Sequence, residues 1–296
     1  MGFKKSRAIN FMLLFAVSII WGAQFAFNKI ALPYFAPTEI AFIRSIVGML
    51  TLSVLWWLTS KNYKKSFAPI ENKLKFNVLL FSIALFEATI PFLLIPWGQQ
   101  HIDSSIAAIL IGTIPIFVVL INFIYTKSIR FRALFSVLLG FTGVAILLLP
   151  GASTDKFFSH IQGELAVLAG AISFAISLFL IRKLPAISEI MSARIILLWA
   201  TIQIVPFLLL KNPQIPVAVD LAALSAVTIL GVFCAGIVYV FYVMLANRAG
   251  VVFASFSNYL VPLIGFSFGI LLFKEAIQVN FIVALALILA ALFFGC

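Results

Sequence analysis

Long runs of apolar residues, separated by short polar segments, dominate the sequence from beginning to end. Each run holds roughly 20 residues, and an α-helix of that length crosses a hydrocarbon core about 30 Å thick. We therefore predict ten membrane-spanning helices. They cover residues 8–31, 38–58, 76–98, 103–125, 132–150, 162–182, 189–210, 221–245, 252–273 and 277–295.

The composition indicates that the lipid bilayer is the solvent of this chain. Of 296 residues, 64% are hydrophobic and 10% are charged, whereas an ordinary soluble domain has about 45–50% and about 25%. Phe alone occurs 32 times, and a chain of this length has too little interior to bury so many rings. We expect an all-α membrane protein whose outer surface contacts the lipid bilayer.

The formal net charge of +11 does not indicate a nucleic-acid partner. The basic residues lie in short clusters between the apolar runs, as they do in the cytoplasmic loops of membrane proteins. Two cysteines, Cys234 and Cys296, support neither a disulfide framework nor a cysteine-based metal site. We predict no nucleic-acid partner, no metal and no cofactor.

The distribution of Lys and Arg predicts the orientation of the chain. The N-terminus and the loops after the second, fourth, sixth and eighth spans hold 14 of these residues, and the opposite loops hold Lys29, Lys156, Lys211 and Lys274. Cytoplasmic loops carry such an excess, so we predict that both termini are cytoplasmic. A cleaved signal peptide is the alternative for the first span, but its apolar stretch is too long for a typical signal sequence.

Two internal matches indicate that the chain consists of two related halves. The segment TEIAFIRSI (38–46) reappears as SEIMSARII (188–196), and AAILIGTIP (107–115) reappears as ASFSNYLVP (254–262). We predict five helices in residues 1–150 and five in residues 151–296. Because five is odd, the second half must be inverted, and inverted repeats are typical of secondary transporters whose substrate site lies between the halves.

Several motifs resemble the EamA branch of the drug/metabolite transporter superfamily. They are WGAQFAFNKIAL, IPFLLIPWGQQHIDSSIAAILIGTIPIF, LLGFTGVAILLLPG and LVPLIGFSFGILLFKE. This resemblance covers nearly the whole chain and implies ten helices, an inverted repeat and a central cavity. It also implies transport of amino acids, nucleotide-like metabolites or drugs, often outward. Similar sequences tend to carry an uncharged residue at the position of Glu87, so the resemblance assigns that residue no role.

Glu87 lies near the middle of the third predicted span. An ionised carboxylate there costs about 2.5–3.5 kcal/mol on insertion scales, and a residue at such a place usually has a function. One hypothesis is proton coupling, with a proton as the coupling ion, and another is pairing with the amine of a substrate. The alternative is a structural bond to a neighbouring helix, for example to Arg44.

The internal repeat also provides candidates for gating or coupling. Arg44 and Arg194 occupy matched positions of the two halves and could pair with carboxylates or with helix-end carbonyls. The alternative, snorkelling to the membrane surface, applies best to Arg194. Pro115 and Pro262 are matched as well, and each frees a carbonyl and bends its helix. Matched interruptions point to the binding site, although a tolerated kink is the alternative reading.

Further substrate-binding candidates are amphipathic residues at middle depth in the first, eighth and ninth spans, where polar groups need partners inside hydrocarbon. They are Trp21, Gln24, Tyr239, Asn258 and Tyr259. For the aromatic residues, ordinary helix packing is the alternative. No set of residues at one depth forms a catalytic constellation, so no catalytic residue is predicted.

These features together predict a secondary transporter of a bacterial inner membrane. We expect it to move a small organic molecule, an amino acid or similar, by alternating access, with net export, as a monomer or homodimer. An ATP-driven pump is not expected because no phosphate-binding P-loop occurs. The alternatives are an intramembrane enzyme acting on a lipid or lipid-linked group, and a channel or structural membrane partner.

Overall fold

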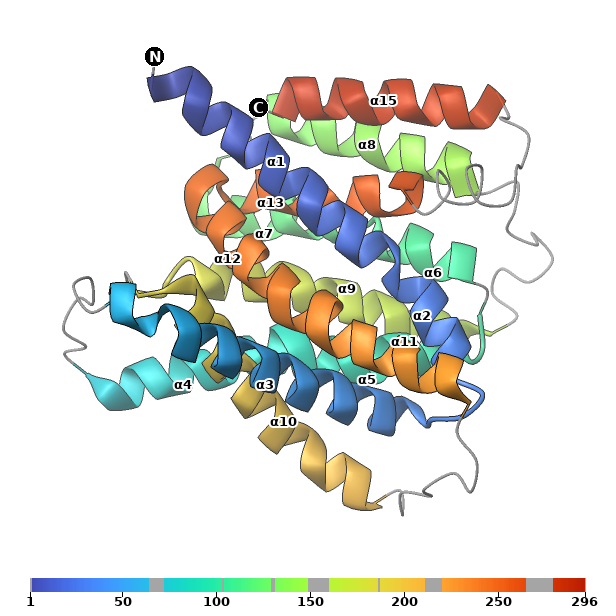
Figure 1. The fold of residues 1–296 in the computed structure, drawn as a ribbon. Coiled ribbons are helices and arrows are strands. Elements are labelled where there is room, and N and C mark those ends of the chain that lie inside the picture. The colour runs from blue at the N-terminus through green and yellow to red at the C-terminus, as the bar shows by residue number, and fades with distance from the viewer. Residues whose placement is uncertain are drawn as a thin grey trace.

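The computed structural model describes residues 2–63, 72–102, 104–128, 131–148, 160–185, 187–210, 220–264 and 279–295. Within these ranges the chain forms helices and no β-strand. Figure 1 shows a bundle whose helices run mostly along one direction, with both chain ends toward the same end of the bundle. A chain that crosses the membrane an even number of times must have both ends on one side, as is seen here. Which end faces the cytoplasm stays a prediction.

The described part of the first half forms nine helical segments, eight α-helices and one π-helical turn. They are α1 (Gly2–Gly22), α2 (Gln24–Ala31), α3 (Pro37–Tyr63), α4 (Lys73–Ala84), the π turn η1 (Leu85–Thr89), α5 (Ile90–Gln99), α6 (Ser104–Ile111), α7 (Ile114–Thr126) and α8 (Phe131–Leu148).

The described part of the second half follows the same order, with a second π-helical turn in its third span. Its segments are α9 (Ile161–Ile181), α10 (Glu189–Leu210), α11 (Leu221–Gly231), the π turn η4 (Val232–Ile237), α12 (Val238–Ala249), α13 (Val251–Ser255), a helical stretch at 257–264 and α15 (Val279–Gly295).

The expectation of an all-α membrane protein is confirmed. Among the described residues, eight helices are long and apolar enough to cross a membrane, and their bounds agree with the first eight predicted spans to within a few residues. Two shorter apolar helices, Val251–Ile264 and Val279–Phe294, lie at the ninth and tenth predicted spans. The predicted residues 265–273 and 277–278 lie outside the described residues.

Within the described residues, three of the spans break into two helical segments at a turn. The first breaks at Ala23, between α1 and α2, and the fourth breaks between α6 and α7. At the second break Pro115 stands in the first turn of α7, where a backbone N–H has no partner within the helix, so the missing N–H of proline costs no hydrogen bond. The Thr113 hydroxyl donates to the carbonyl of Leu110 there. In the ninth span the break falls at Phe256, so Pro262 lies within the stretch that follows.

The two π turns lie at the middle of the third and eighth spans. In η1 the N–H of Ile90 donates to the carbonyl of Leu85, and Pro91 has no N–H to offer the carbonyl of Glu87. In η4 the N–H of Val238 donates to Phe233, so the carbonyl of Cys234 loses its usual partner. Each turn therefore leaves a backbone carbonyl deep in the bundle without its α-helical donor. Such turns occur often at functional sites.

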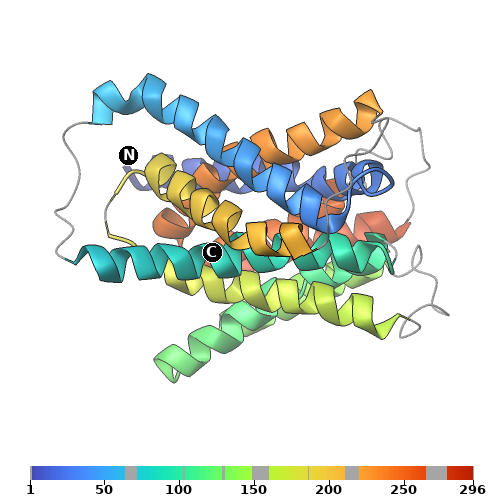
Figure 2. The same cartoon turned by 90° about the horizontal axis from the view of Figure 1, so that it is seen from below.

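The helices pack in a pattern that repeats between the halves. Each half's second helix contacts the other's, α3 against α10, and each half's fifth helix does the same, α8 against α15. The third span of each half packs on the first of the other, α5 on α9 and α11–α12 on α2 and α1. Figure 1 shows α8 and α15 along one edge, and Figure 2 shows α10 between α3 and the α4–α5 helix.

Glycines allow the closest of these approaches. A Cβ on Gly98 of α5 would lie 2.8 Å from the carbonyl oxygen of Gly163 on α9. A Cβ on Gly143 of α8 would lie 3.1 Å from the carbonyl oxygen of Ala284 on α15. Small residues of this kind are typical of helix contacts in membranes, where close backbone packing replaces the hydrophobic driving force.

Candidate functional site

Glu87 lies inside the bundle, in the π turn η1. Its side chain is only 2% exposed. Ser177 of α9 donates a hydrogen bond to its Oε2 atom, while its Oε1 atom has no hydrogen-bond partner. Among the described residues no cation lies within ion-pairing distance of this carboxyl group. The structural bond considered for Glu87 therefore goes to Ser177 and not to Arg44.

Arg44 of α3 is buried in the same region, with 4% of its surface exposed. Its Nη2 atom donates to Oε1 of Gln24, at 3.0 Å, and to the carbonyl of Cys234, at 2.8 Å. The guanidinium carbon lies 4.0 Å from the centre of the Phe92 ring, which is a cation–π contact. Its Nε atom has no partner, and no described carboxylate neutralises this charge.

The carbonyls that the two π turns leave without an α-helical donor accept hydrogen bonds from side chains of other helices. The Tyr239 hydroxyl of α12 donates to the carbonyl of Glu87, at 2.7 Å. The indole N–H of Trp21 donates to the carbonyl of Cys234, at 3.3 Å, next to Arg44. Since unsatisfied backbone groups are costly in a membrane, these bonds allow both irregular turns to persist.

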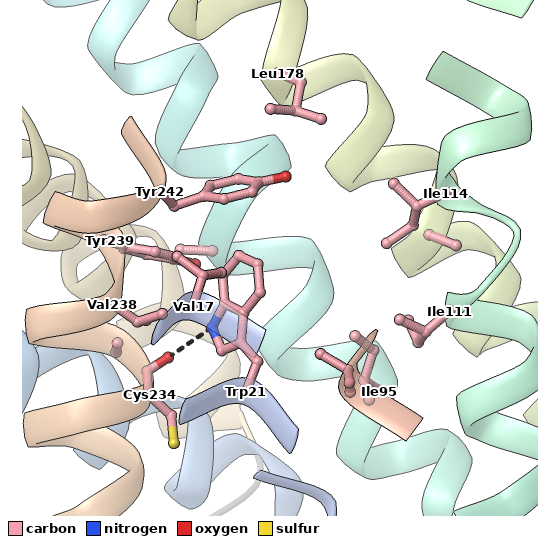
Figure 3. Packing of buried hydrophobic residues seen from close by; sticks show 14 of the residues in the cluster. Val17, Trp21, Ile95, Ile111, Ile114, Leu178, Cys234, Val238, Tyr239 and Tyr242 are labelled. Carbon is pink, nitrogen blue, oxygen red and sulfur yellow. Dashed lines mark hydrogen bonds between the residues drawn. The ribbon is translucent and has the colours of Figure 1, made fainter. Parts of the chain in front are cut away.

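Aromatic rings surround these polar groups. The Trp21 ring meets that of Tyr242 edge-on, with centroids 4.6 Å apart, and Tyr239 stacks on Phe92 at 6.2 Å. Figure 3 shows Trp21, Tyr239 and Tyr242 together, with the bond from Trp21 to Cys234. We call this group the central cluster. It comprises Trp21, Gln24, Arg44, Glu87, Phe92, Ser177, Cys234, Tyr239 and Tyr242.

The central cluster brings together five of the sequence-predicted residues, Trp21, Gln24, Arg44, Glu87 and Tyr239. They come from the first, second, third and eighth spans, so both halves contribute. A site between the halves is the arrangement that the internal repeat predicts. Their role in binding stays a prediction.

Asn258 and Tyr259 make their hydrogen bonds elsewhere. The Asn258 amide donates to the carbonyl of Ser255 in its own span, at 3.0 Å. The Tyr259 hydroxyl donates to the carbonyl of Val137 on α8, at 2.8 Å, and its ring occupies the space that a Cβ on Gly140 would need. The Tyr259 bond joins the ninth span to α8, and the Asn258 bond lies within the ninth span.

Arg194 and the two prolines also lie apart from the cluster bonds. Arg194 is partly exposed near the start of α10, and its guanidinium carbon lies 5.9 Å from the Trp56 ring centre. Arg44 lies near the start of α3, so the two arginines have related places but different surroundings. Pro115 and Pro262 are both buried, but only Pro115 stands directly after a helix break, whereas Pro262 lies within the helical stretch 257–264. Their proposed gating role stays a prediction.

The sequence analysis missed Ser177, Phe92 and Cys234. Ser177 and Ser173 lie one turn apart on α9, and Ser173 donates to the carbonyl of Phe86 at 2.7 Å, so this pair of serines was a readable signal. Cys234 contributes through its backbone carbonyl, which no side-chain pattern reveals. Among the described residues, no group of three His, Cys, Asp or Glu could hold a metal ion.

The fold and the central cluster define a multi-span helical membrane protein with a polar site between two repeated halves. The family model described as the EamA-like transporter family matches residues 9–149 and again residues 161–294. The chain therefore belongs to the EamA-like transporter family, within the drug/metabolite transporter superfamily.

Individual relatives carry transporter names without a substrate. An uncharacterized transporter of Buchnera aphidicola subsp. Schizaphis graminum is 29% identical over 57% of this chain and 54% of its own length, so the chain spans about half of that relative. The uncharacterized inner membrane transporter YedA of Escherichia coli K12 is 23% identical over 88% of this chain and 81% of its own length.

Further comparisons agree on class and fold. An uncharacterized transporter of Archaeoglobus fulgidus is 27% identical over 85% of both chains. A solved crystal structure superposes with a TM-score of 0.73, covering 99% of this chain and 97% of that chain, at 16% sequence identity. That structure supports the fold alone.

Proposed function

We propose that this protein is a secondary transporter of a bacterial inner membrane that moves a small zwitterionic metabolite, an amino acid or similar. The substrate binds in the central cluster, and the two halves expose that cluster to each side of the membrane in turn. Net movement is outward. The name of the relative YedA supports the inner-membrane location, and the resemblance described above supports outward transport.

One observation carries the choice of substrate class. The central cluster holds one buried cation and one buried carboxyl group, and each retains a polar atom without a partner, Nε of Arg44 and Oε1 of Glu87. Buried charged groups are stable only when their bonding capacity is used. A zwitterion supplies a carboxylate for Arg44 and an amine for Glu87, so it complements both groups at once.

The π turns support alternating access. Each turn belongs to one half, and side chains of the other half bind its exposed carbonyls, Tyr239 for Glu87 and Trp21 with Arg44 for Cys234. When one half moves against the other, these side chains can release the two carbonyls and bind other acceptors, and no hydrogen bond of a regular helix has to break. Two packed arrangements of similar energy are what such a switch requires.

Counterflow in liposomes tests this proposal. Purified protein is reconstituted with a mixture of unlabelled amino acids inside, and uptake of each labelled amino acid is measured against its gradient. A carrier accumulates at least one label transiently, whereas a channel, an enzyme or a structural protein accumulates none. Labelled monoamines and labelled monocarboxylates serve as the matched probes that lack one of the two charges. Equal exchange of either probe would contradict a zwitterion site.

The Glu87→Gln variant separates the two functional hypotheses for Glu87, because it keeps the shape and removes the charge. If Glu87 binds the substrate amine, exchange loses affinity about 10- to 150-fold, the worth of a hydrogen bond to a charged group. If Glu87 couples protons, exchange persists and only proton-driven accumulation is lost. Wild-type affinity, accumulation and pH dependence together would remove Glu87 from the mechanism.

A further inference from the structure

A second polar region lies away from the central cluster, in a cavity of about 590 Å³ at the end of the bundle that holds both chain termini. The ends of α7 and α9 line it, together with the start of α8 and the α12–α13 junction. This is the end that we predict to face the cytoplasm. None of the central-cluster residues lines this cavity.

The lining of the cavity is basic and polar on one part and apolar on the other. Its polar residues include Arg132, Arg182, Asn122, Thr126 and Ser128, and its described lining holds no Asp or Glu. Apolar side chains such as Val252 and Phe253 complete it.

Additional cations flank this cavity. Lys127, Lys183 and Arg248 are sequence neighbours of lining residues. Lys127 ends α7 in a left-handed conformation, and Lys183 lies 5.6 Å from the Tyr125 ring centre. Arg248 donates to Asn10 at 3.4 Å. Several positive charges around one concave site raise the local concentration of anions.

The two lining arginines retain most of their bonding capacity. Arg132 donates one long bond, of 3.4 Å, to the carbonyl of Phe293, and no described residue pairs with Arg182. The planar guanidinium group offers five donors in a fork that matches phosphate oxygens. An anion held by both arginines would therefore form several charge-assisted bonds.

We propose that this cavity binds an anionic phosphate group at the membrane surface. The phosphate is carried by the headgroup of an anionic phospholipid or by a soluble phosphate ester. Basic pockets between membrane helices on the cytoplasmic side bind anionic headgroups in this way. The polar residues receive the phosphate, and when the ligand is a lipid the apolar residues contact its glycerol and the beginning of an acyl chain.

The position of the arginines links this site to the movement of the halves. Arg132 stands on α8 of the first half, and Arg182 follows α9 of the second half. A phosphate held by both stabilises the arrangement seen here over any arrangement that separates the two arginines. Such a ligand shifts the conformational equilibrium by its difference in affinity for the two states.

Binding to the purified full-length protein tests the proposal without knowledge of the transported substrate. The thermal unfolding midpoint is measured in neutral detergent with added dioleoylphosphatidylglycerol, with dioleoylphosphatidylcholine, and with glycerol 3-phosphate. A ligand that binds only the folded state raises the midpoint, and the rise grows with the logarithm of the ligand concentration above its Kd. The variants are Arg132→Gln, Arg182→Gln, their combination, and Arg7→Gln. The last removes an exposed cation of α1 that does not line the cavity.

We expect the anionic lipid to raise the midpoint more than phosphatidylcholine does. Each arginine substitution should weaken its apparent affinity about fivefold, and the combination about 25-fold, while Arg7→Gln has no such effect. The same arginine dependence with glycerol 3-phosphate alone would support the proposal with a soluble ligand. Stabilisation by neither phosphate compound, or stabilisation that Arg7→Gln weakens as much as the cavity variants, would overturn it.

A variant that folds poorly does not obscure the outcome. Arg182→Lys keeps the positive charge and loses the fork of donors, so we expect an affinity between those of wild type and Arg182→Gln. Lipids that remain bound are counted by native mass spectrometry of the folded fraction. Equal retention of phosphatidylglycerol by wild type and by the double variant, together with no arginine-dependent stabilisation by glycerol 3-phosphate, would also overturn the proposal.

Discussion

The two π turns occupy the same place in the two halves but differ in chemistry. Both η1 and η4 interrupt the third helix of their half, and both expose a carbonyl that side chains of the other half bind. The turn of the first half carries the carboxyl group of Glu87, whereas the turn of the second half carries the thiol of Cys234.

This comparison separates what the fold needs from what the proposed function needs. The matched turns and their cross-half bonds belong to the architecture, because both halves have them. Among the described residues, the second half has no carboxyl group in its π turn and no buried guanidinium at the position matched to Arg44. Arg194, at the position matched to Arg44, is partly exposed beside Trp56. The asymmetric groups are therefore the ones that we assign to the substrate.

The largest effect is expected from removing the buried cation. Arg44→Gln should weaken substrate exchange about 10- to 150-fold, because a charge-assisted hydrogen bond to the substrate carboxylate is lost. Arg194→Gln is the matched comparison, and it should weaken exchange less than Arg44→Gln does, because Arg194 is partly exposed and lies outside the central cluster. Counterflow assays on both variants measure this difference. Equal losses in the two variants would make the arginines symmetric partners and defeat the comparison.

A smaller effect is expected from the tyrosine that binds the η1 carbonyl. Tyr239→Phe leaves the carbonyl of Glu87 without a partner and should lower the free energy of unfolding by about 1–3 kcal/mol. Tyr259→Phe removes a similar bond, to the carbonyl of Val137, and should cost about as much. Only Tyr239→Phe should also slow exchange, since Tyr259 lies outside the central cluster. Thermal unfolding and counterflow of the same preparations check both statements.

The smallest effect on stability is expected from restoring a backbone donor. Pro91→Ala gives Glu87 an N–H partner within its own helix and favours a regular α-helix over the π turn. We expect a stability change of about 1 kcal/mol or less, the net worth of one hydrogen bond, together with slower exchange. Pro96→Ala restores a donor for a residue outside the turn and is the control. Faster exchange in Pro91→Ala would show that the turn is dispensable.

Much of the fold could be predicted from the sequence because long apolar runs leave few alternatives in a membrane. The helix bounds followed from hydrophobic length, and the repeated halves followed from short matches around Arg44 and Pro115. For the π turn η1 the sequence offers one signal, Pro91, whose missing N–H leaves the carbonyl of Glu87 without its α-helical donor. The turn η4 has no proline at the matched place, so nothing in the side-chain pattern indicated it.

The candidate site was harder to predict because depth in the membrane does not give the direction of a side chain. Asn258 and Tyr259 lie at a suitable depth, yet they bond within their own span and to α8. Ser177 pairs with Ser173 one turn away on α9, and this pair was a signal that the sequence analysis did not use. Cys234 contributes a backbone oxygen, and only the path of the chain shows where that atom lies.

The native thiol of Cys234 provides the most direct test of the central claim, that the cluster between the halves is the substrate site exposed by alternating access. Cys234 is buried and free, and Cys296→Ser leaves it as the single cysteine. In liposomes, labelling of this variant by a small maleimide is followed with and without saturating amino acids. The account predicts slow labelling that amino acids active in counterflow change at least severalfold and inactive ones leave alone. A labelling rate that is the same with every solute would contradict it.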